Sequence, residues 1–218
     1  MTYEQLRSNE EVRALIQRGN ENLGVLGYTD HSAAHCALVA ERAADILAAF
    51  GYDGHHQELV KMAGFLHDIG NAVNRKHHAE YGALLAWDIL SKTDLPLLDR
   101  VAVVAAIGNH DESTGGAMDE ISAALIIADK TDVRRNRVRT RDLSTFDIHD
   151  RVNYAVTGTH LEVDAAKKVV RLDLQVDESI CSMFDYFDIF LSRMQMSRRA
   201  CDVLGATFSL TVNGGKVL

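Results

Sequence analysis

Apolar residues recur at helical spacing through the first two-thirds of the chain. The clearest case is the segment from residue 31 to 50, where one apolar stripe contains Leu38, Val39, Ala43, Ile46, Leu47 and Phe50. Residues three and four positions apart lie on one face of a helix, so the stripe predicts an amphipathic helix with one buried side. Asp30 is expected to cap its start, and Gly51 is expected to end it.

The same spacing predicts further helices on both sides of this segment. Ser8 and Glu11 have the spacing of a capping box, which indicates a helix start. Pro96 is expected to open another helix, because its missing N–H is not needed in a first turn. The predicted later helices cover residues 55–68, 78–90, 97–110 and 121–138.

The pattern changes after about residue 143. Apolar and polar residues then alternate over residues 159–177 around a four-residue turn, which predicts a β-hairpin. An amphipathic helix over residues 178–204 and a short strand from residue 207 are expected to follow. We therefore predict a mostly α protein, with a helical bundle in residues 1–142 and a small α+β extension in residues 143–218 that packs on it.

Composition narrows the class of protein. The 218 residues are 47% apolar, which is enough for a sizeable core, and the chain has neither an apolar run of 18 residues nor a charged-then-apolar leader. We expect a soluble cytoplasmic protein with no membrane partner. The net charge of −8 argues against a nucleic acid polymer as a partner. It leaves room for a small phosphorylated ligand in a local basic pocket.

Histidine and aspartate residues gather at the ends of the predicted helices. His67 and Asp68 end one apolar helix, His110 ends another, and Asp129 interrupts an apolar run. A buried polar group without a partner costs about 1–3 kcal/mol. We therefore expect a shared partner for these side chains, and histidine is among the commonest metal ligands.

The order of these residues resembles the HD superfamily of metal-dependent phosphohydrolases. The likeness covers about residues 28–140 and contains a first histidine, the doublet in the stretch LHDIG, and a distant aspartate in the stretch IIADKTD. By this resemblance, one divalent cation would be bound by His35, His67, Asp68 and Asp129. The resemblance also implies that the helical bundle is of the HD type.

Two more histidines resemble elements of binuclear HD branches, namely the HD-GYP cyclic dinucleotide phosphodiesterases and the bacterial diadenosine tetraphosphate hydrolases. His78, which precedes Gly82 at the required spacing, and His110 would hold a second cation, with Asp68 as the bridge. The resemblance thus implies divalent metal ions, two per chain, from among Fe, Mn, Co, Ni, Zn and Mg. The chain has no GYP element and no HHE triplet, which weakens the case for a cyclic dinucleotide substrate.

The predicted catalytic residues are Asp68, His67 and Lys130. Many relatives carry a lysine where this chain has Asn71, so a cation expected to contact phosphate is missing there. Lys130 could replace it, and so could Arg75 or Lys76.

The predicted substrate-binding residues are His31, Arg134 and Arg135. Arginine forks match phosphate oxygens, and both arginines follow Asp129 closely in the chain. Two plainer interpretations stay open at this point. His31 could make a local hydrogen bond at a helix start, and the arginines could complement the dipole of a helix C-terminus.

We predict a metal-dependent phosphohydrolase that uses metal-activated water to cleave a phosphoester or phosphoanhydride of a small phosphorylated metabolite, in particular a nucleotide. Two alternatives stay open: a di-iron oxygenase of the HD type, and a nucleotide-binding sensor without catalytic activity. Exposed edge strands in the C-terminal extension would allow two copies to pair, so a homodimer is also an open alternative.

Overall fold

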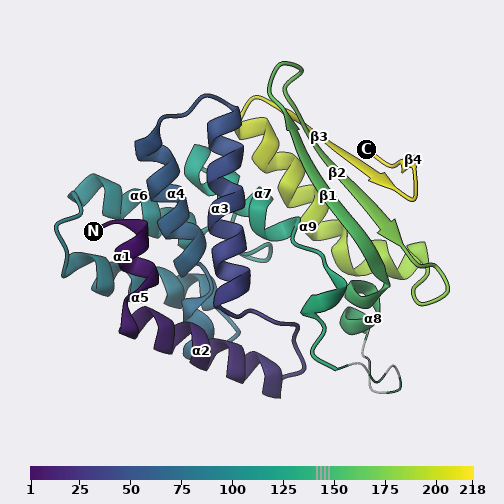
Figure 1. The fold of residues 1–218 in the computed structure, drawn as a ribbon, viewed down its shortest axis with the longest axis horizontal. Coiled ribbons are helices and arrows are strands. Elements are labelled where there is room, and N and C mark those ends of the chain that lie inside the picture. The colour runs from purple at the N-terminus through teal and green to yellow at the C-terminus, as the bar shows by residue number, and fades with distance from the viewer. Residues whose placement is uncertain (141, 143, 145, 147) are drawn as a thin grey trace.

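The structure is a computed structural model that describes residues 1–140, 142, 144, 146 and 148–218. Helices form a body around the N-terminus, and a small sheet lies on the other side of the molecule near the C-terminus (Figure 1). The predicted domain boundary falls at residue 143, which lies outside the described residues. The division into two domains therefore stays a prediction.

The helical body is formed by the first two-thirds of the chain, as expected. Its helices are α1 (Tyr3–Arg7), α2 (Glu10–Val25), α3 (Ala33–Ala49), α4 (Gly54–Leu66), α5 (His78–Ser91), α6 (Leu97–Gly108) and α7 (Glu120–Lys130). Two short 3-10 helices, η1 (Ile69–Ala72) and η2 (Arg135–Arg137), follow α4 and α7. The C-terminal part consists of α8 (Ile148–Ala155), β1 (Val156–Asp164), β2 (Val169–Val176), α9 (Met183–Val203), β3 (Thr207–Val212) and β4 (Gly215–Lys216).

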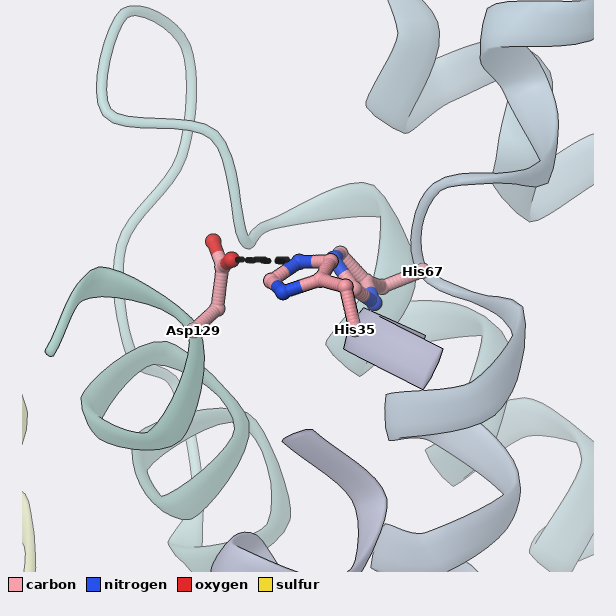
Figure 2. A group of neighbouring side chains, drawn as sticks. All are labelled: His35, His67 and Asp129. Carbon is pink, nitrogen blue, oxygen red and sulfur yellow. Dashed lines mark ion pairs between the residues drawn. The ribbon is translucent and has the colours of Figure 1, made fainter. Parts of the chain in front are cut away.

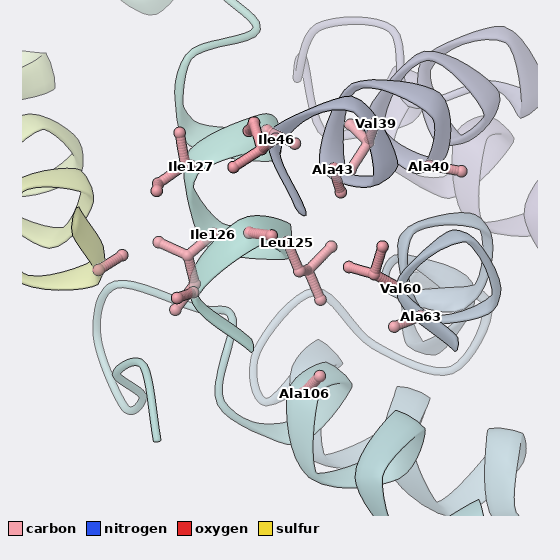
Figure 3. Packing of buried hydrophobic residues seen from close by; sticks show 14 of the residues in the cluster. Val39, Ala40, Ala43, Ile46, Val60, Ala63, Ala106, Leu125, Ile126 and Ile127 are labelled. Carbon is pink, nitrogen blue, oxygen red and sulfur yellow. The ribbon is translucent and has the colours of Figure 1, made fainter. Parts of the chain in front are cut away.

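Helix α7 is the central element of the body. Every residue from Ile121 to Lys130 is buried, and its apolar side chains pack against those of α3 and α4 (Figure 3). A helix that is apolar on all sides belongs in the interior of a protein. The polar residues at the C-terminal end of α7, Asp129 and Lys130, are therefore delivered into the interior as well.

The sheet has the strand order β1-β2-β3-β4. The hairpin of β1 and β2 is antiparallel, as predicted, whereas β3 pairs with β2 in parallel. Alternate residues of β2 and β3 are buried, and α9 packs against both β3 and α7. The fold class is confirmed: a helical bundle carries a small C-terminal α+β element. Among the described residues, no helix is both long and apolar enough to cross a membrane.

Four predicted helix boundaries are wrong, and one of them is the start of α9, which is Met183 rather than residue 178. The cap of α2 is Asn9 rather than Ser8, and α3 begins after Ser32 rather than Asp30. Helix α7 ends at Lys130, eight residues before the predicted end. The chain leaves the helix there because Asp132 turns into the interior, where it is fully buried and pairs with His35. The short helices α1 and α8 and the strand β4 were not predicted.

Candidate metal centre

Three elements bring the predicted residues together. His35 lies on α3, His67 follows the last residue of α4, and Asp129 lies one residue before the end of α7. The three side chains point toward one another (Figure 2). Asp129 Oδ1 lies 3.4 Å from His35 Nε2 and 3.6 Å from His67 Nε2. Each of these residues can therefore offer one ligand atom to the same ion.

The two oxygens of Asp68 lie beside different histidines. Its Oδ2 is 3.1 Å from His67 Nε2 and 3.7 Å from His35 Nε2, whereas its Oδ1 is 3.7 Å from His78 Nε2. His78 Nε2 lies in turn 3.2 Å from His110 Nε2. The centre thus has a first half (His35, His67 and Asp129) and a second half (His78 and His110), and Asp68 lies between them.

Three histidines of the centre are oriented by the same local hydrogen bond. The Nδ1 of His67, His78 and His110 lies 2.8, 3.2 and 2.6 Å, respectively, from the backbone carbonyl oxygen three residues earlier. A carbonyl oxygen can only accept, so Nδ1 must carry a proton, and Nε2 is the ring atom that can bind a metal ion. Histidines that bind metals are held in this way, because the second ring nitrogen fixes the tautomer and the ring orientation.

His35 is oriented by a carboxylate instead. Its Nδ1 donates to Asp132 Oδ2 at 2.8 Å, and the two residues are 97 positions apart in the chain. Asp132 also accepts hydrogen bonds from Arg134 at 2.5 and 2.9 Å. Burial alone would raise the pKa of Asp132, but His35 and the nearby Arg137 hold that pKa below its ordinary value. An ionised carboxylate makes the imidazole a stronger electron donor than a carbonyl does.

Glycine at position 70 allows the two halves to approach each other. A Cβ atom on Gly70 would lie 1.9 Å from the carbonyl oxygen of His78 and 2.5 Å from the amide nitrogen of Gly82. Both neighbours are backbone atoms, which cannot move aside as a flexible side chain can. Only glycine therefore lets η1 pack directly on the start of α5, and this contact places Asp68 beside His78.

Asn71, the departure from the family pattern, positions Asp68. Its Nδ2 donates to Asp68 Oδ1 at 2.8 Å and to the Asp68 carbonyl oxygen at 3.0 Å. A cation lies one helical turn later, because Arg75 Nη1 is 3.4 Å from Asn71 Oδ1 and 3.3 Å from His78 Nε2. The structure thus places Arg75, rather than Lys76, beside the second half.

The electrostatics of the centre favour positive charge between its carboxylates. Burial would lower the pKa of His67, but Asp68 and Asp129 outweigh it and raise that pKa to about 10. Burial and the neighbouring histidines lower the pKa of His110 to about 3, and burial also lowers the pKa of His78. The imidazoles of His78 and His110 are therefore neutral, as metal-binding histidines must be. The carboxylates of the first half attract positive charge, which also favours the binding of a metal ion.

Several ligand atoms have no other partner. Among the described residues, His35 Nε2, His67 Nε2 and Asp68 Oδ2 are buried and lack a hydrogen-bond partner. Such atoms carry a desolvation cost of about 1–3 kcal/mol each unless something else binds them. The donor set of imidazole nitrogens and carboxylate oxygens suits Mn, Fe, Co, Ni or Zn. The residues therefore fit divalent metal ions.

Lys130 lies at the edge of the centre and is already paired. Its Nζ is 2.7 Å from Asp129 Oδ2 and 2.8 Å from Glu112 Oε2, and its side chain is buried. Burial would lower the pKa of Lys130, but these two carboxylates raise it. Lys130 is thus a fixed cation whose contacts hold Asp129, and its predicted catalytic role stays a prediction.

The predicted substrate-binding residues lie in different places. His31 is buried, and its ring centre is 5.4 Å from that of His35; its Nδ1 also makes the expected local hydrogen bond, to the Thr29 carbonyl oxygen. Arg134 is occupied by Asp132, and Arg135 donates to the Tyr154 carbonyl oxygen and stacks on that ring. Arg134 thus reaches the Nδ1 side of His35 through Asp132 Oδ2, and Arg135 lies against Tyr154. Their predicted role in substrate binding stays a prediction.

Sequence reasoning missed the role of Asp132 and the contacts of Glu112 and Arg193. Asp132 was visible three residues after Asp129 in the stretch IIADKTD, where its spacing could have marked a second aspartate of the centre. No local signal pointed to Arg193, whose Nε lies 3.4 Å from Glu112 Oε1 across 81 positions of the chain.

Comparison with known proteins identifies the family. The HD domain model matches residues 32–151, more than half of the chain, so this protein belongs to the HD domain family. An uncharacterized protein of Methanocaldococcus jannaschii is 30% identical over 161 residues, which cover 64% of this chain and 62% of the relative. The alignment thus spans less than two thirds of that relative.

The family consists in general of metal-dependent hydrolases, and the resemblance to the HD superfamily is confirmed. The likeness to its binuclear branches stays a prediction.

Proposed function

We propose that this protein is a metal-dependent phosphohydrolase that acts on a small phosphorylated metabolite, in particular a nucleotide. The observation that carries the proposal is the set of imidazole Nε2 atoms directed at Asp68 and Asp129, with each ring held through its Nδ1. Four independent orienting bonds of this kind are difficult to explain by packing alone. They support a centre built to hold cations.

The first half would hold one divalent ion through His35, His67, Asp68 and Asp129. The second half would hold another through His78, His110 and the second oxygen of Asp68. When bound, such ions lower the pKa of a coordinated water and neutralise charge on phosphoryl oxygens.

The protein's own residues perform the remaining tasks. Asn71 holds Asp68 in place through two hydrogen bonds. Lys130 keeps Asp129 ionised and oriented. Arg75 brings positive charge beside the second half, where it can bind a phosphoryl oxygen.

Metal content and phosphate release test the proposal together. Protein purified without chelators or an affinity-column metal is expected to contain about two ions per chain and to release phosphate from a nucleotide. Asp68→Ala removes the shared ligand, so activity should fall by at least about 10²–10³-fold. Asp88→Ala, an exposed aspartate on α5, is the matched control.

A second pair of variants separates the two halves. His77 and His78 are neighbours, but His77 is exposed and His78 is buried in the second half. His78→Ala is expected to lose about one ion per chain, while His77→Ala keeps both. Full metal content and full phosphate release in Asp68→Ala would refute the proposal. Oxygen uptake without phosphate release would favour an oxygenase, and nucleotide binding without turnover would favour a sensor.

A further inference from the structure

A cavity lies between the helical body and the C-terminal helices. It has a volume of about 300 Å³ and is lined from the body by the loop before α3, by Arg75 and by Glu112. The other wall is formed by α8 and α9, through Asn153, Phe190 and Arg193 among others. Neither part of the chain encloses this space alone.

Three contacts connect the cavity with the metal centre. His31 lines the cavity, and its ring packs edge-on against that of His35 in the first half. Arg75 lines it as well, and its Nη1 reaches His78 in the second half. A chain of ion pairs runs from Arg193 through Glu112 and Lys130 to Asp129. A ligand in the cavity would therefore lie beside both halves.

Two arginines face this cavity from opposite parts of the chain, and each is stacked on an aromatic ring. Arg75 lies 5.1 Å from the ring centre of Tyr28, and Arg193 lies 5.1 Å from that of Phe190. Stacking holds the guanidinium plane and leaves its edge available for hydrogen bonds. Two arginines against Glu112 give the lining positive charge in a chain whose net charge is −8.

Arg193 retains free donors. Its Nε is directed at Glu112, and no hydrogen bond joins its Nη1 or Nη2 to any other described residue. An arginine has five N–H donors in a fixed fork, so a bidentate contact to an anion is still available. The side chain is 22% exposed, which gives a ligand access without full solvent screening.

We propose that this cavity binds a compact phosphate monoester of nucleoside size, and that Arg193 of α9 binds its phosphate group. The inference rests on the proposed function and adds the C-terminal element to the substrate site. Apolar and aromatic walls from Leu26, Tyr28, Ile189 and Phe190 suit a planar organic group. The volume lies at the low end of small-molecule sites, about 300–1,000 Å³, which favours one nucleotide over a dinucleotide.

Calorimetry with the full chain after metal removal tests this without turnover. The probes are adenosine 5′-monophosphate and adenosine, which differ only in the phosphate. The monophosphate should bind at least about tenfold more tightly, because charge-assisted hydrogen bonds are the strong ones. Arg193→Gln should lower its affinity about tenfold and change adenosine binding less than twofold. Arg198→Gln, an exposed arginine on the same helix, should change neither.

Two further variants guard against loss of folding. Arg193→Lys keeps the charge and should retain part of the affinity. His149→Glu, at an exposed residue that lines the cavity, adds negative charge. It should lower the affinity for the monophosphate about fivefold and leave the affinity for adenosine unchanged. Equal binding of both probes by the native chain would overturn the inference. An unchanged affinity for the monophosphate in a folded Arg193→Gln variant would also overturn it. If Arg193→Gln does not fold, an unchanged affinity in His149→Glu would do so.

Turnover with metal separates this inference from the proposed function. Arg193→Gln should raise KM about tenfold and change kcat less than about threefold, as expected for a lost binding contact. Binding that depends on Arg193 without phosphate release under any metal would refute the proposed function and leave this inference standing. Phosphate release by the native chain, together with an unchanged KM in Arg193→Gln, would refute this inference and leave the proposed function standing.

Discussion

The two halves of the centre differ in how one of their histidines is oriented, because His67 in the first half is held by the same local carbonyl bond as the histidines of the second half. In the first half, His35 donates to a buried carboxylate 97 positions away in the chain. In the second half, His78 and His110 donate to carbonyl oxygens three positions earlier. The first half also has Asp129 in addition to the shared Asp68, whereas the second half has the guanidinium of Arg75 3.3 Å from His78 Nε2.

This difference predicts unequal affinity. Extra negative charge and a carboxylate-oriented imidazole should make the first half bind its ion more tightly. The nearby cation in the second half must move before an ion can bind there. In the proposed binuclear centre, the second half would therefore be the one to exchange its ion or to accept a substrate oxygen, and the first half would stay occupied.

The largest expected effect comes from Gly70, which holds the halves together. Gly70→Ala places a methyl group against the backbone of His78 and Gly82, so the free energy of unfolding should fall by at least about 3 kcal/mol. The second ion should be lost with it. Denaturant unfolding and metal analysis measure both effects. Gly116→Ala is the control, because a Cβ there meets no atom within 4 Å; equal stability of the two variants would contradict the packing argument.

Asp132 tests the first half alone. Asp132→Asn keeps the shape of the side chain but removes the charge behind His35, so metal affinity in this half should fall about 10–100-fold. Metal titration of the folded variant measures the change. The matched control is Asp45→Asn, at an exposed position on α3. If both ions bound as in the native chain, the carboxylate would have no part in metal binding.

Stepwise metal removal tests the order of affinity. As chelator is added, the second half should lose its ion first, at a chelator activity about tenfold lower than the first half requires. His78→Ala should abolish the first step, which is the release of the ion from the second half. Asp132→Asn should lower the chelator activity at which the first half releases its ion, so that the two steps lie closer together. Simultaneous release of both ions would show that the halves do not differ in affinity.

The smallest effect belongs to a residue outside both halves. Tyr3 is 2% exposed, and burial raises the pKa of its phenol to about 12 from 10.0. The buried, protonated phenol of Tyr3 stabilises the folded chain fully below pH 10. This stabilisation is lost as the pH rises toward 12, because the phenol of the unfolded chain ionises readily in that range and the buried phenol does not. The unfolding temperature of Tyr3→Phe should fall less between pH 10 and 12 than that of the native chain. Parallel curves would assign the alkaline loss to other groups.

Much of the helical body could be predicted because its signals are local. The apolar stripe of α3, the glycine after the His67–Asp68 doublet and the proline before α6 each act within one or two turns. At the end of α7, a distant contact prevailed over the local pattern. The predicted end of α7 lies too far along the chain because the residues after Lys130 have no strong stop signal. Their turn is stabilised by the contact between buried Asp132 and His35.

The predicted site divides in the same way. His67, His78 and His110 take their orientation from their own turn, so their motifs carried the necessary information. Nearness to Asp129 in the sequence is the basis for predicting Arg134 and Arg135 as substrate-binding residues; in the structure they pair with Asp132 and Tyr154, and a substrate-binding role stays a prediction. Arg75 and Arg193 line the cavity beside the histidines, and α9 had to fold against α7 for that cavity to form.

The sequence by itself thus determined the family, the helical class and the histidines and aspartates that converge. These depend on residue spacing, which a helix converts directly into a shared face or a shared turn. The tertiary structure alone decided that Asp132 supports His35 and that Arg193 reaches Glu112. Such contacts join residues far apart in the chain, and they arise only from the angles and distances at which the helices pack.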